Sequence, residues 1–485
     1  MTNVYPSCEH CIAQIFVKGN LINKKMAQQF FAQLMGLGES KELNQELELF
    51  PTEEREILQD NFMKLSGGSK KIDRQTLENA VKLLLPKPEA DILARRICDL
   101  MTGQIATNNT VTFDGYIHCA AVMIKGMLED KATQLIYLAK GKKGVATFEE
   151  CFNFSTQIIR LTFLIIRNLP AFRSWDGNYI CNLEEDSVNR LATAITNELE
   201  KSSSENIDNQ AVSAWLSKSS LLNEFFGMLS HHIFQFPMIK GKYLIPLCRG
   251  IPTQVYPSWL SLSDILFINC ALPSELRSEW RFLFSSRIHG ESFSSLMGNI
   301  IDKGPSVVFI KDFDGHIFGG FASTSWSLGP QFKGTNANFV FSLAPEMVIY
   351  NATGFNDHYQ YFNIQQQTFP NGMGMGGQLD YFAIWVDSEY GKGKCSPSCT
   401  TFNCRQLSGK PEFSIDMIEV WAVGPEPTEE DDETEARPSI LDVDVEGTAM
   451  LRMLNRGPIS EGMRDNATSD DPEEKELYVS SVSSQ

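Results

Sequence analysis

The sequence reads WRFLFSSRIHGESF at residues 280–293, VVFIKDFDGHIFGGFAS at 307–323 and FKGTNANFVFSL at 332–343. It continues with NATGFNDHYQYF at 351–362, NGMGMGGQLDYFAIWVD at 371–387 and DMIEVWAVG at 416–424. These short runs are rich in β-branched and aromatic residues, and turn residues separate them at close intervals. The pattern predicts an antiparallel β structure in this stretch, and its spacing is typical of a β-sandwich.

The bulk composition restricts the possible partners. The chain has 485 residues, enough for two or three domains, and a formal net charge of −18 at pH 7. Such a charge argues against nucleic acid as a partner and against simple electrostatic docking on anionic lipid. The 11 cysteines are scattered, and Met1–Leu21 contains no uninterrupted apolar segment of the secretory kind. We therefore expect reduced thiols and a cytoplasmic location.

The most apolar helical segment of the sequence is Ile158–Leu169, and Arg160 and Arg167 interrupt it. It is also shorter than the ~20 apolar residues that a transmembrane helix needs. The segment therefore predicts a core helix with two arginines that extend to its surface.

The first 34 residues are interpreted as an N-terminal extension. They contain a C-x-x-C pair at Cys8 and Cys11, which can be half of a zinc site, but no second half with matching spacing follows. Directly after them, the residues from Met35 to Ser40 match the N-myristoylation pattern M-G-x-x-x-[ST]. Gly36 is therefore a candidate lipidation site, provided that Met35 is the initiator.

Residues 35–155 have a helical pattern that contains three similar units. Each unit has a polar loop, one aliphatic residue (Ile72, Val111 or Val145) and then a helix, as in an EF-hand. A calcium loop needs carboxylates at positions 1, 3 and 5 and a glutamate at position 12. With these residues at position 8, the first three acids are missing in every unit, and only Glu149 remains at position 12. The units predict a calcium-free, EF-hand-like scaffold.

Residues 156–255 predict a second helical region. Its helices include LLNEFFGMLSHHIFQF, in which His231 and His232 are neighbours and point about 100° apart, so we do not expect a shared metal. Lys201–Asn209 predicts a surface loop, and Pro252–Pro257 a boundary segment. Two further helices are expected within Ser261–Phe282.

The composition changes abruptly after Gly424. Residues 425–438 are acidic and predict an extended linker. Residues 439–456 predict an amphipathic helix, and residues 457–485 are polar and predicted to be disordered. The candidate partner-binding residues of the predicted helix share one helical face. They are Ile440, Val443, Met450, Leu451 and Leu454. Such a helix can pack on its own protein or enter a groove of a partner, and the sequence favours neither.

Several groups in the β-rich stretch could be read as catalytic, cofactor-binding or metal-binding sites. They are His289 beside Ser292; His289, His316 and His358 with Asp312, Asp314 and Asp357; the glycine-rich run Asn371–Gly377; and Cys395, Cys399 and Cys404. None has the spacing of a nucleophile elbow, a known metal motif or a phosphate loop. We therefore expect structural roles for these residues, with no cofactor, no metal and no catalytic site.

The β-rich stretch resembles the TLDc domain, and residues 256–424 are assigned to it. The motifs that carry the resemblance are W-R-x-L-F-S-S at Trp280–Ser286, H-G with S-F at His289–Phe293, D-x-x-G-x-x-F-G-G-F at Asp312–Phe321, T-G-x-N-D-H-Y at Thr353–Tyr359, G-M-G-G-Q at Gly374–Gln378, W-V-D at Trp385–Asp387 and E-V-W-A-V-G at Glu419–Gly424. The resemblance implies a two-sheet β-sandwich flanked by helices, so the fold class expected for the whole chain is α+β.

Outside this domain, the chain resembles the animal TLDc proteins that are associated with mTOR at lysosomes. The EF-hand-like half, the acidic linker, Ser439–Asp442 and Ser460–Arg464 support this. The resemblance implies a non-enzymatic regulator on the cytoplasmic face of the lysosome membrane, with a lipid anchor and mTOR pathway components as partners. It also implies binding to the head of the vacuolar ATPase, which the C-terminal helix would enter.

One departure from this resemblance concerns the start of the chain. The related proteins begin with Met-Gly, whereas this sequence begins Met1-Thr2, which cannot be myristoylated. We interpret the first 34 residues as an upstream extension, which is either part of a second isoform or the result of a wrongly assigned start. The resemblance to TLDc proteins also implies an alternative function for the chain, that of an enzyme or scaffold in oxidative-stress defence.

Overall fold

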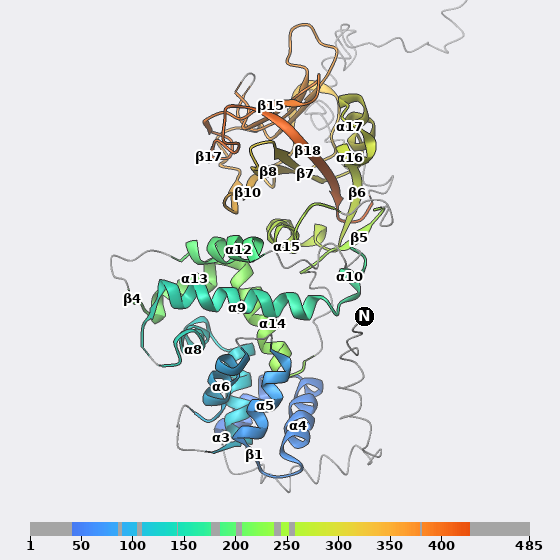
Figure 1. Cartoon of the computed structure of the whole chain (residues 1–485). Helices are drawn as coiled ribbons and strands as arrows, with labels where there is room; N and C mark the ends of the chain where they lie inside the picture. Colours follow the sequence, from blue (N-terminus) through green and yellow to red (C-terminus); the bar gives the residue numbers. More distant parts are fainter. Residues whose placement is uncertain are drawn as a thin grey trace, which may run out of the picture. The chain divides into compact units, whose positions relative to one another are not determined.

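The structure is a computed structural model, and it describes residues 41–85, 90–103, 109–142, 144–175, 185–199, 206–236, 244–251, 258–378 and 381–426 (Figure 1). The described residues up to Pro425 belong to one compact unit of the chain. The predictions for the Cys8–Cys11 pair, Gly36, the acidic linker and the C-terminal helix concern residues outside the described part. The fold is α+β, as the sequence predicts, with helices in the N-terminal half and mostly antiparallel strands in the C-terminal half.

The helical half begins with two helix–strand–helix units joined by a short ladder. After α3 (Lys41–Glu48), the first unit is α4 (Thr52–Ser66), β1 (Lys71–Asp73) and α5 (Arg74–Leu84), and the second is α6 (Ala90–Met101), β2 (Thr110–Thr112) and α7 (Phe113–Ala120). Strands β1 and β2 are antiparallel, and the fully buried Ile72 lies opposite Val111. Asp73 and Thr112 cap the helices that follow, because their side chains accept hydrogen bonds from backbone N–H groups of the first turn.

A second pair of units follows after a short π-helix, η1 (Ala121–Lys125). These units are α8 (Leu128–Lys140), β3 (Ala146–Thr147) and α9 (Phe148–Ile166), then α12 (Glu185–Asn197), β4 (Asn206–Ile207) and α13 (Asn209–Lys218). Two of our expectations are wrong here. The buried residue of the third strand is Ala146 and not Val145, and it lies opposite Ile207. The predicted loop Lys201–Asn209 therefore contains a strand, whose only apolar residue is Ile207.

The third unit uses its glutamate for a helix cap. With Ala146 as the buried strand residue, Glu150 takes the place that Glu149 was expected to hold. The Glu150 carboxylate accepts a hydrogen bond from the Thr147 backbone N at 2.9 Å, and the Thr147 hydroxyl accepts one from the Glu150 N at 3.2 Å. This reciprocal capping box engages the carboxylate. Among the described residues, no group of three or more His, Cys, Asp or Glu side chains is placed to hold a metal ion. The EF-hand interpretation itself stays a prediction.

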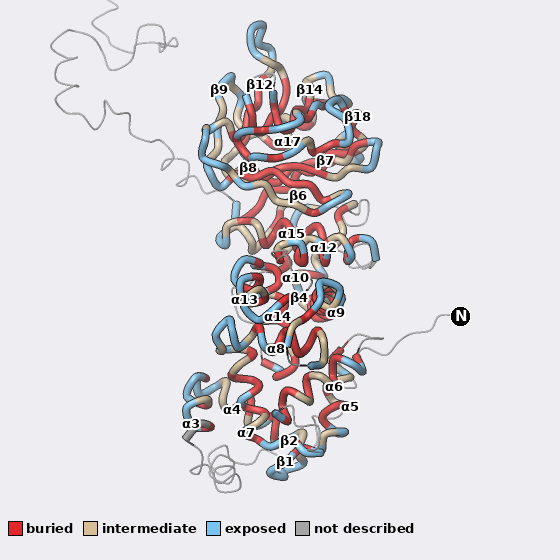
Figure 2. The backbone as a smooth tube through the Cα atoms, turned by 90° about the vertical axis from the view of Figure 1, so that its left-hand side faces the viewer, coloured by how far each residue is buried: buried red, intermediate tan, exposed pale blue. Residues whose placement is uncertain are grey.

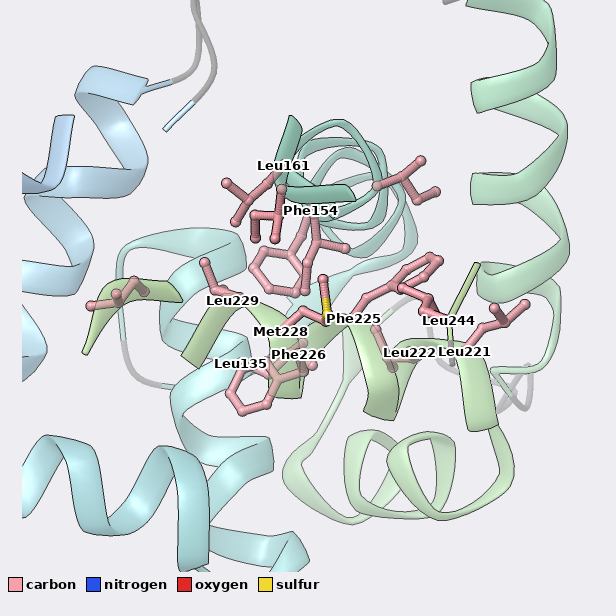
Figure 3. Close-up of a cluster of buried hydrophobic side chains, with 14 of the residues drawn as sticks. Leu135, Phe154, Leu161, Leu221, Leu222, Phe225, Phe226, Met228, Leu229 and Leu244 are labelled. Atoms are coloured by element: carbon pink, nitrogen blue, oxygen red, sulfur yellow. The ribbon is translucent and has the colours of Figure 1, made fainter. Parts of the chain in front are cut away.

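Helix α9 runs unbroken across residues 155 and 156, so the two helical regions share it. It packs against α14 (Ser220–Ile233), and Figure 3 shows Phe154 and Leu161 of α9 pointing toward the apolar side chains of α14. Arg160 pairs with Glu185 at the surface of α9, as expected of an arginine that extends from a core helix. In the described residues, no helix combines the length and the apolar character that crossing a membrane requires.

The segment before the β-rich stretch contains one of the two predicted helices. Helix α15 (Leu262–Ala271) forms, but Pro273 is followed only by a 3-10 turn, η2 (Ser274–Leu276), and then by strand β6 (Glu279–Ser285). The prediction of a second helix is therefore wrong. Strand β6 forms because it pairs along its length with β18, from Trp280 opposite Val423 to Ser285 opposite Glu419. Long-range pairing of this kind overrides local propensity.

Two antiparallel sheets form the C-terminal half and share strand β18 (Glu412–Val423). The first sheet runs β11 (Val348–Asn351), β10 (Phe339–Ala344), β8 (Ile317–Ala322), β7 (Ser306–Asp312), β18, β6 and β5 (Leu247–Arg249), of which β5 is parallel to β6. The second runs β9 (Gly329–Lys333), β12 (Gln360–Asn363), β13 (Gly372–Met375), β14 (Ile384–Asp387), β15 (Lys392–Lys394) and β18. Shorter elements are α10 (Pro170–Arg173), α16 (Ser286–His289), α17 (Phe293–Ile300), β16 (Ser398–Cys399) and β17 (Cys404–Arg405).

The first sheet is buried on both faces, as the red tube of β7 and β8 in Figure 2 shows. Along β7, Val308 and Ile310 belong to the core between the sheets, whereas Val307 and Phe309 belong to a core that is continuous with the helical half. Alternate side chains of a strand point to opposite faces, so one strand serves both cores. Trp175, from the helical half, lies across this second face with its ring centroid 4.9 Å from that of Trp421.

Two adjacent glycines allow the close packing of the first sheet. A Cβ atom at Gly319 would lie 1.9 Å from the Val308 carbonyl oxygen and 2.8 Å from Phe341 Cζ. At Gly320 it would lie 2.4 Å from the sulfur of Met375 in the second sheet. The G-G of the sequence therefore marks the point of closest approach between backbone and neighbouring side chains.

We predict that Gly319→Ala destabilises the protein by about 1–3 kcal/mol or more, because the added methyl group forces backbone to move in a packed core. The matched control is Gly298→Ala in helix α17, where a Cβ atom would meet nothing within 4 Å. That control should gain roughly 0.5–1 kcal/mol from helix propensity. Thermal unfolding followed by circular dichroism measures both variants, and equal melting temperatures would contradict the assignment.

Candidate functional site

The His289 side chain contacts the backbone of Ser285 and the ring of Phe284, and not the side chain of Ser292. The Nδ1 atom of His289 accepts a hydrogen bond from the Ser285 backbone N at 3.1 Å, and its ring stacks on Phe284 with centroids 5.4 Å apart. Ser292 precedes helix α17 without a side-chain capping bond. No hydrogen bond of the described residues joins the two side chains. A serine nucleophile needs a base within hydrogen-bonding reach, and this arrangement does not supply one.

Asp312, His316 and Ser408 lie together, but the order of their hydrogen bonds is not that of a catalytic triad. Buried Asp312 accepts a hydrogen bond from the His316 backbone N at 2.8 Å and another from the Ser408 hydroxyl at 2.7 Å. The His316 Nδ1 atom lies 3.5 Å from the same carboxylate. In a triad the serine donates to the imidazole, whereas Ser408 donates to the carboxylate. The group closes the turn between β7 and β8.

Two of the other metal candidates, Asp314 and His358, lie in separate surroundings. Asp314 forms an ion pair with Lys410 at 2.9 Å. His358 donates a hydrogen bond from Nδ1 to the Gly377 carbonyl oxygen at 2.7 Å, and its ring stacks on Phe332 at a centroid distance of 4.4 Å. The residues therefore have individual structural partners.

The glycine-rich run is itself mostly strand β13. A Cβ atom at Gly372 would lie 2.5 Å from the Trp385 ring, and one at Gly374 would lie 2.5 Å from the Phe382 ring. These glycines let the aromatic side chains of the second sheet lie flat against its backbone. Gly376 (φ +69°) and Gly377 (φ +80°) follow the strand in left-handed conformations. The run therefore serves close packing and a turn.

Three loops meet at one end of the second sheet, and we call this group the loop cluster: Thr353–His358, Gly376–Gln378 and Cys399–Cys404. The Thr401 hydroxyl accepts a hydrogen bond from Gly377 N at 2.8 Å and donates one to the Asn356 side chain at 2.7 Å. The Thr353 hydroxyl donates to the Thr400 carbonyl oxygen at 2.7 Å. The sequence prediction included residues of all three loops, but it did not identify Thr401, which joins them.

The loop cluster presents an aromatic side chain to solvent. Phe355 is 85% exposed, although its neighbours Thr353 and Asn356 are held by the hydrogen bonds of the cluster. An exposed aromatic side chain on a braced turn is a feature of protein-binding surfaces. Phe355 is therefore a candidate contact residue for a protein partner.

The three cysteines of the β-rich stretch differ in their surroundings. Cys395 is buried, and burial raises the pKa of its thiol to about 12. Cys399 and Cys404 lie directly opposite each other in the β16–β17 ladder. All three are free cysteines.

Comparison with known proteins gives the family. Residues 256–424 match the TLDc domain. The chain is 34% identical over 471 residues to the MTOR-associated protein MEAK7 of Gallus gallus, a match that covers 90% of this chain and 99% of the relative. The MEAK7 of Homo sapiens is 33% identical over 414 residues, which cover 82% of this chain and 90% of the relative.

The chain belongs to the MEAK7 family of TLDc-domain proteins. A more limited similarity, 34% over 152 residues, connects it to oxidation resistance protein 1 of Homo sapiens, covering 31% of this chain and 16% of that protein. The similarity to MEAK7 therefore includes the helical half as well as the TLDc domain.

We predict that Thr401→Val destabilises the loop cluster by about 1–3 kcal/mol, because the isosteric change leaves a buried N–H of Gly377 without its acceptor. The matched control is Thr400→Val, whose side chain is exposed, and its cost should be below about 0.5 kcal/mol. Hydrogen exchange at the Gly377 amide reports the local effect. Equal protection of that amide in the two variants would contradict the role given to Thr401.

Proposed function

We propose that the chain is a non-enzymatic regulator of mTOR signalling that acts through protein contacts. The observation that carries this proposal is the similarity to MEAK7, which extends over 90% of the chain and is not limited to the TLDc domain. The printed name of these relatives is MTOR-associated protein. The hydrogen bonds of His289, Asp312 and His358 also support a binding role, because they engage these side chains in the fold.

The proposed partner is the cytosolic head of the vacuolar ATPase at the lysosome surface. The basis is the TLDc resemblance together with the predicted helix at residues 439–456, which an acidic linker separates from the domain. The domain and the helix would supply two attachment points on one partner. Linking two modules raises the effective concentration of the second after the first has bound.

A charge placed on the apolar face of the helix tests this proposal. The variant combines Val443→Asp with Leu451→Asp, and the matched control combines Val445→Asp with Ala449→Asp on the opposite side of the predicted helix. We expect the first variant to lose at least tenfold in co-purification of the pump and the control to keep it. Unchanged co-purification by the first variant would exclude the helix as an attachment point.

The proposed membrane attachment is a myristoyl group on Gly36 of a chain that begins at Met35. Mass spectrometry of the N-terminal peptide from the endogenous protein should find acylated Gly36. A chain that starts at Met35 and carries Gly36→Ala should lose its membrane fraction, because an alanine terminus is not a substrate for this acylation. An N-terminus at Met1 or Thr2 as the sole form would contradict the proposal.

The four helix–strand–helix units are proposed to be a calcium-free, EF-hand-like scaffold. The antiparallel contacts of β1 with β2 and of β3 with β4 support this, since paired EF-hand loops meet through such short strands. The use of Glu150 in a capping box supports the calcium-free state.

The alternative function is an enzyme or scaffold in oxidative-stress defence. The similarity to oxidation resistance protein 1 favours it, but this similarity is confined to 31% of the chain. The two functions differ in what they require of His289 and Ser292. If the double variant His289→Ala with Ser292→Ala lost protection from oxidants while it still bound the pump, the alternative would be favoured.

A further inference from the structure

Two cysteines form a cross-strand pair within the loop cluster. Strands β16 and β17 are antiparallel, and Cys399 is the direct partner of Cys404, next to the pair of Ser398 with Arg405. Directly opposed residues of antiparallel strands have Cα atoms roughly 4.5–5.5 Å apart. A disulfide spans Cα distances of about 4.4–6.8 Å. The backbone therefore already holds these two residues at a distance that a disulfide can bridge.

The hairpin that carries the pair has one side exposed to solvent and one side buried. Ser398, Thr400, Asn403 and Arg405 are exposed, and the two cysteine side chains point to the opposite side, where each is at most 5% exposed. Cys399 faces Gly376 of the neighbouring loop, since a Cβ atom at that glycine would lie 2.9 Å from the Cys399 sulfur. Because so little of either side chain is exposed, the probe chosen for this pair is a hydroperoxide of small volume, close to water in size.

The two thiols differ in reactivity. The Cys404 thiol donates a hydrogen bond to the Cys399 sulfur and lowers the pKa of Cys399 below its ordinary value, with further help from the backbone at Phe402 and Thr401. The same interaction raises the pKa of Cys404, which keeps its proton. Cys395, by contrast, is held as a thiol by burial. A thiolate is the nucleophilic form of cysteine, so Cys399 is the reactive member of the pair.

We propose that Cys399 and Cys404 form a thiol-oxidation site for small hydroperoxides, with Cys399 as the attacking residue and Cys404 as the resolving residue. This site goes beyond the proposed binding function and does not depend on it. It is also distinct from the His289–Ser292 pair considered for the alternative function.

The reaction balances with one hydroperoxide. The Cys399 thiolate attacks the terminal peroxide oxygen, the O–O bond breaks, and the leaving oxygen departs as water or an alcohol after it takes up a proton. Cys399 is oxidised by two electrons to a sulfenic acid. The Cys404 sulfur then attacks the Cys399 sulfur, an S–S bond forms, and the hydroxyl group leaves as water with the proton of Cys404. A dithiol reductant then reduces the disulfide by thiol–disulfide exchange, is itself oxidised to a disulfide, and returns both cysteines to thiols.

Oxidation at this pair would act on the loop cluster. Thr400 and Thr401 lie between the two cysteines and hold the Thr353–His358 turn, on which Phe355 is exposed. A disulfide would close the segment Cys399–Cys404 into a ring and fix the geometry of these two threonines. The exposed aromatic residue and the oxidation site therefore share one structural support.

The test uses the full chain and hydrogen peroxide as the probe. Trypsin cleavage after Lys394 and Arg405 releases one peptide, Cys395–Arg405, which contains all three cysteines. The parent variant is therefore Cys395→Ala, so that the peptide keeps only the proposed pair. After peroxide treatment of the folded protein, removal of the peroxide and alkylation of the remaining thiols in denaturant, we expect this peptide to be two hydrogens lighter than its reduced form and to escape alkylation. A dithiol reductant should restore both alkylation sites.

Two further substitutions in the Cys395→Ala background separate the roles. With Cys404→Ser, the reaction should stop at a sulfenic acid on Cys399, which dimedone traps as a stable adduct when the treated protein is unfolded in denaturant that contains it. With Cys399→Ser, Cys404 should remain an unmodified thiol under the same treatment. Circular dichroism spectra identical to those of the wild-type chain show that the variants are folded.

Several outcomes would overturn the proposal. One is a peptide in the folded Cys395→Ala protein that is fully alkylated after peroxide treatment. Another is dimedone labelling of Cys404 in the Cys399→Ser variant, which would reverse the roles. A third is a disulfide in the wild-type chain that joins Cys395 to either partner, because the pairing would then not follow the strand register.

Discussion

Strand β18 pairs with strands of both sheets and also contacts the segment that precedes helix α15. Its first residues pair with β15, its later residues pair with β6, and β7 runs along most of its length. The strand also carries Glu419, a fully buried carboxylate that accepts hydrogen bonds from the Ser258 hydroxyl at 2.8 Å and the Trp421 ring N–H at 3.1 Å. An unpaired charge in this position would be costly, so the hydrogen bonds restrict how the segment before α15 lies on the sheet.

This constraint explains why the conspicuous side chains of the TLDc domain have structural roles. A domain with one sheet buried on both faces has little room for water, and each polar side chain inside it needs a partner. Asp312 receives the Ser408 hydroxyl, and His358 donates to the Gly377 carbonyl oxygen. What remains exposed is the outer side of turns such as the one that carries Phe355. The exposed turns are therefore the part of the domain that is available for contact with other proteins.

The sequence predicted those parts of the fold that depend on many residues at once. The β-rich stretch has repeated turns and aromatic runs, and helix α9 has a long apolar pattern, so both were recognised. Strand β4 was missed because its signal is one isoleucine, Ile207, in a polar run, and its pairing with β3 depends on a contact far away in sequence. The first residues of strand β6 were also assigned to the predicted helix within Ser261–Phe282, because the pairing of β6 with β18 depends on residues far away in the sequence. At the candidate site, the sequence identified the motif residues but not Ser408 and Thr401. A hydroxyl group that joins two loops belongs to no motif of fixed spacing, so the sequence alone does not mark it.

The end of β18 has a mechanical consequence. Strand β18 ends at Val423, and the chain then leaves the sheet. The Val423 N–H donates a hydrogen bond to the Pro305 carbonyl oxygen, and the Gly424 N–H donates one to the Glu279 carbonyl oxygen. A pull on the C-terminal segment along the strand would load the ladders with β6 and β7 in shear. The hydrogen bonds of these ladders lie across the strand direction, so many of them would resist together instead of opening one after another. The domain therefore resists tension along β18 without first unfolding at the C-terminal end of that strand.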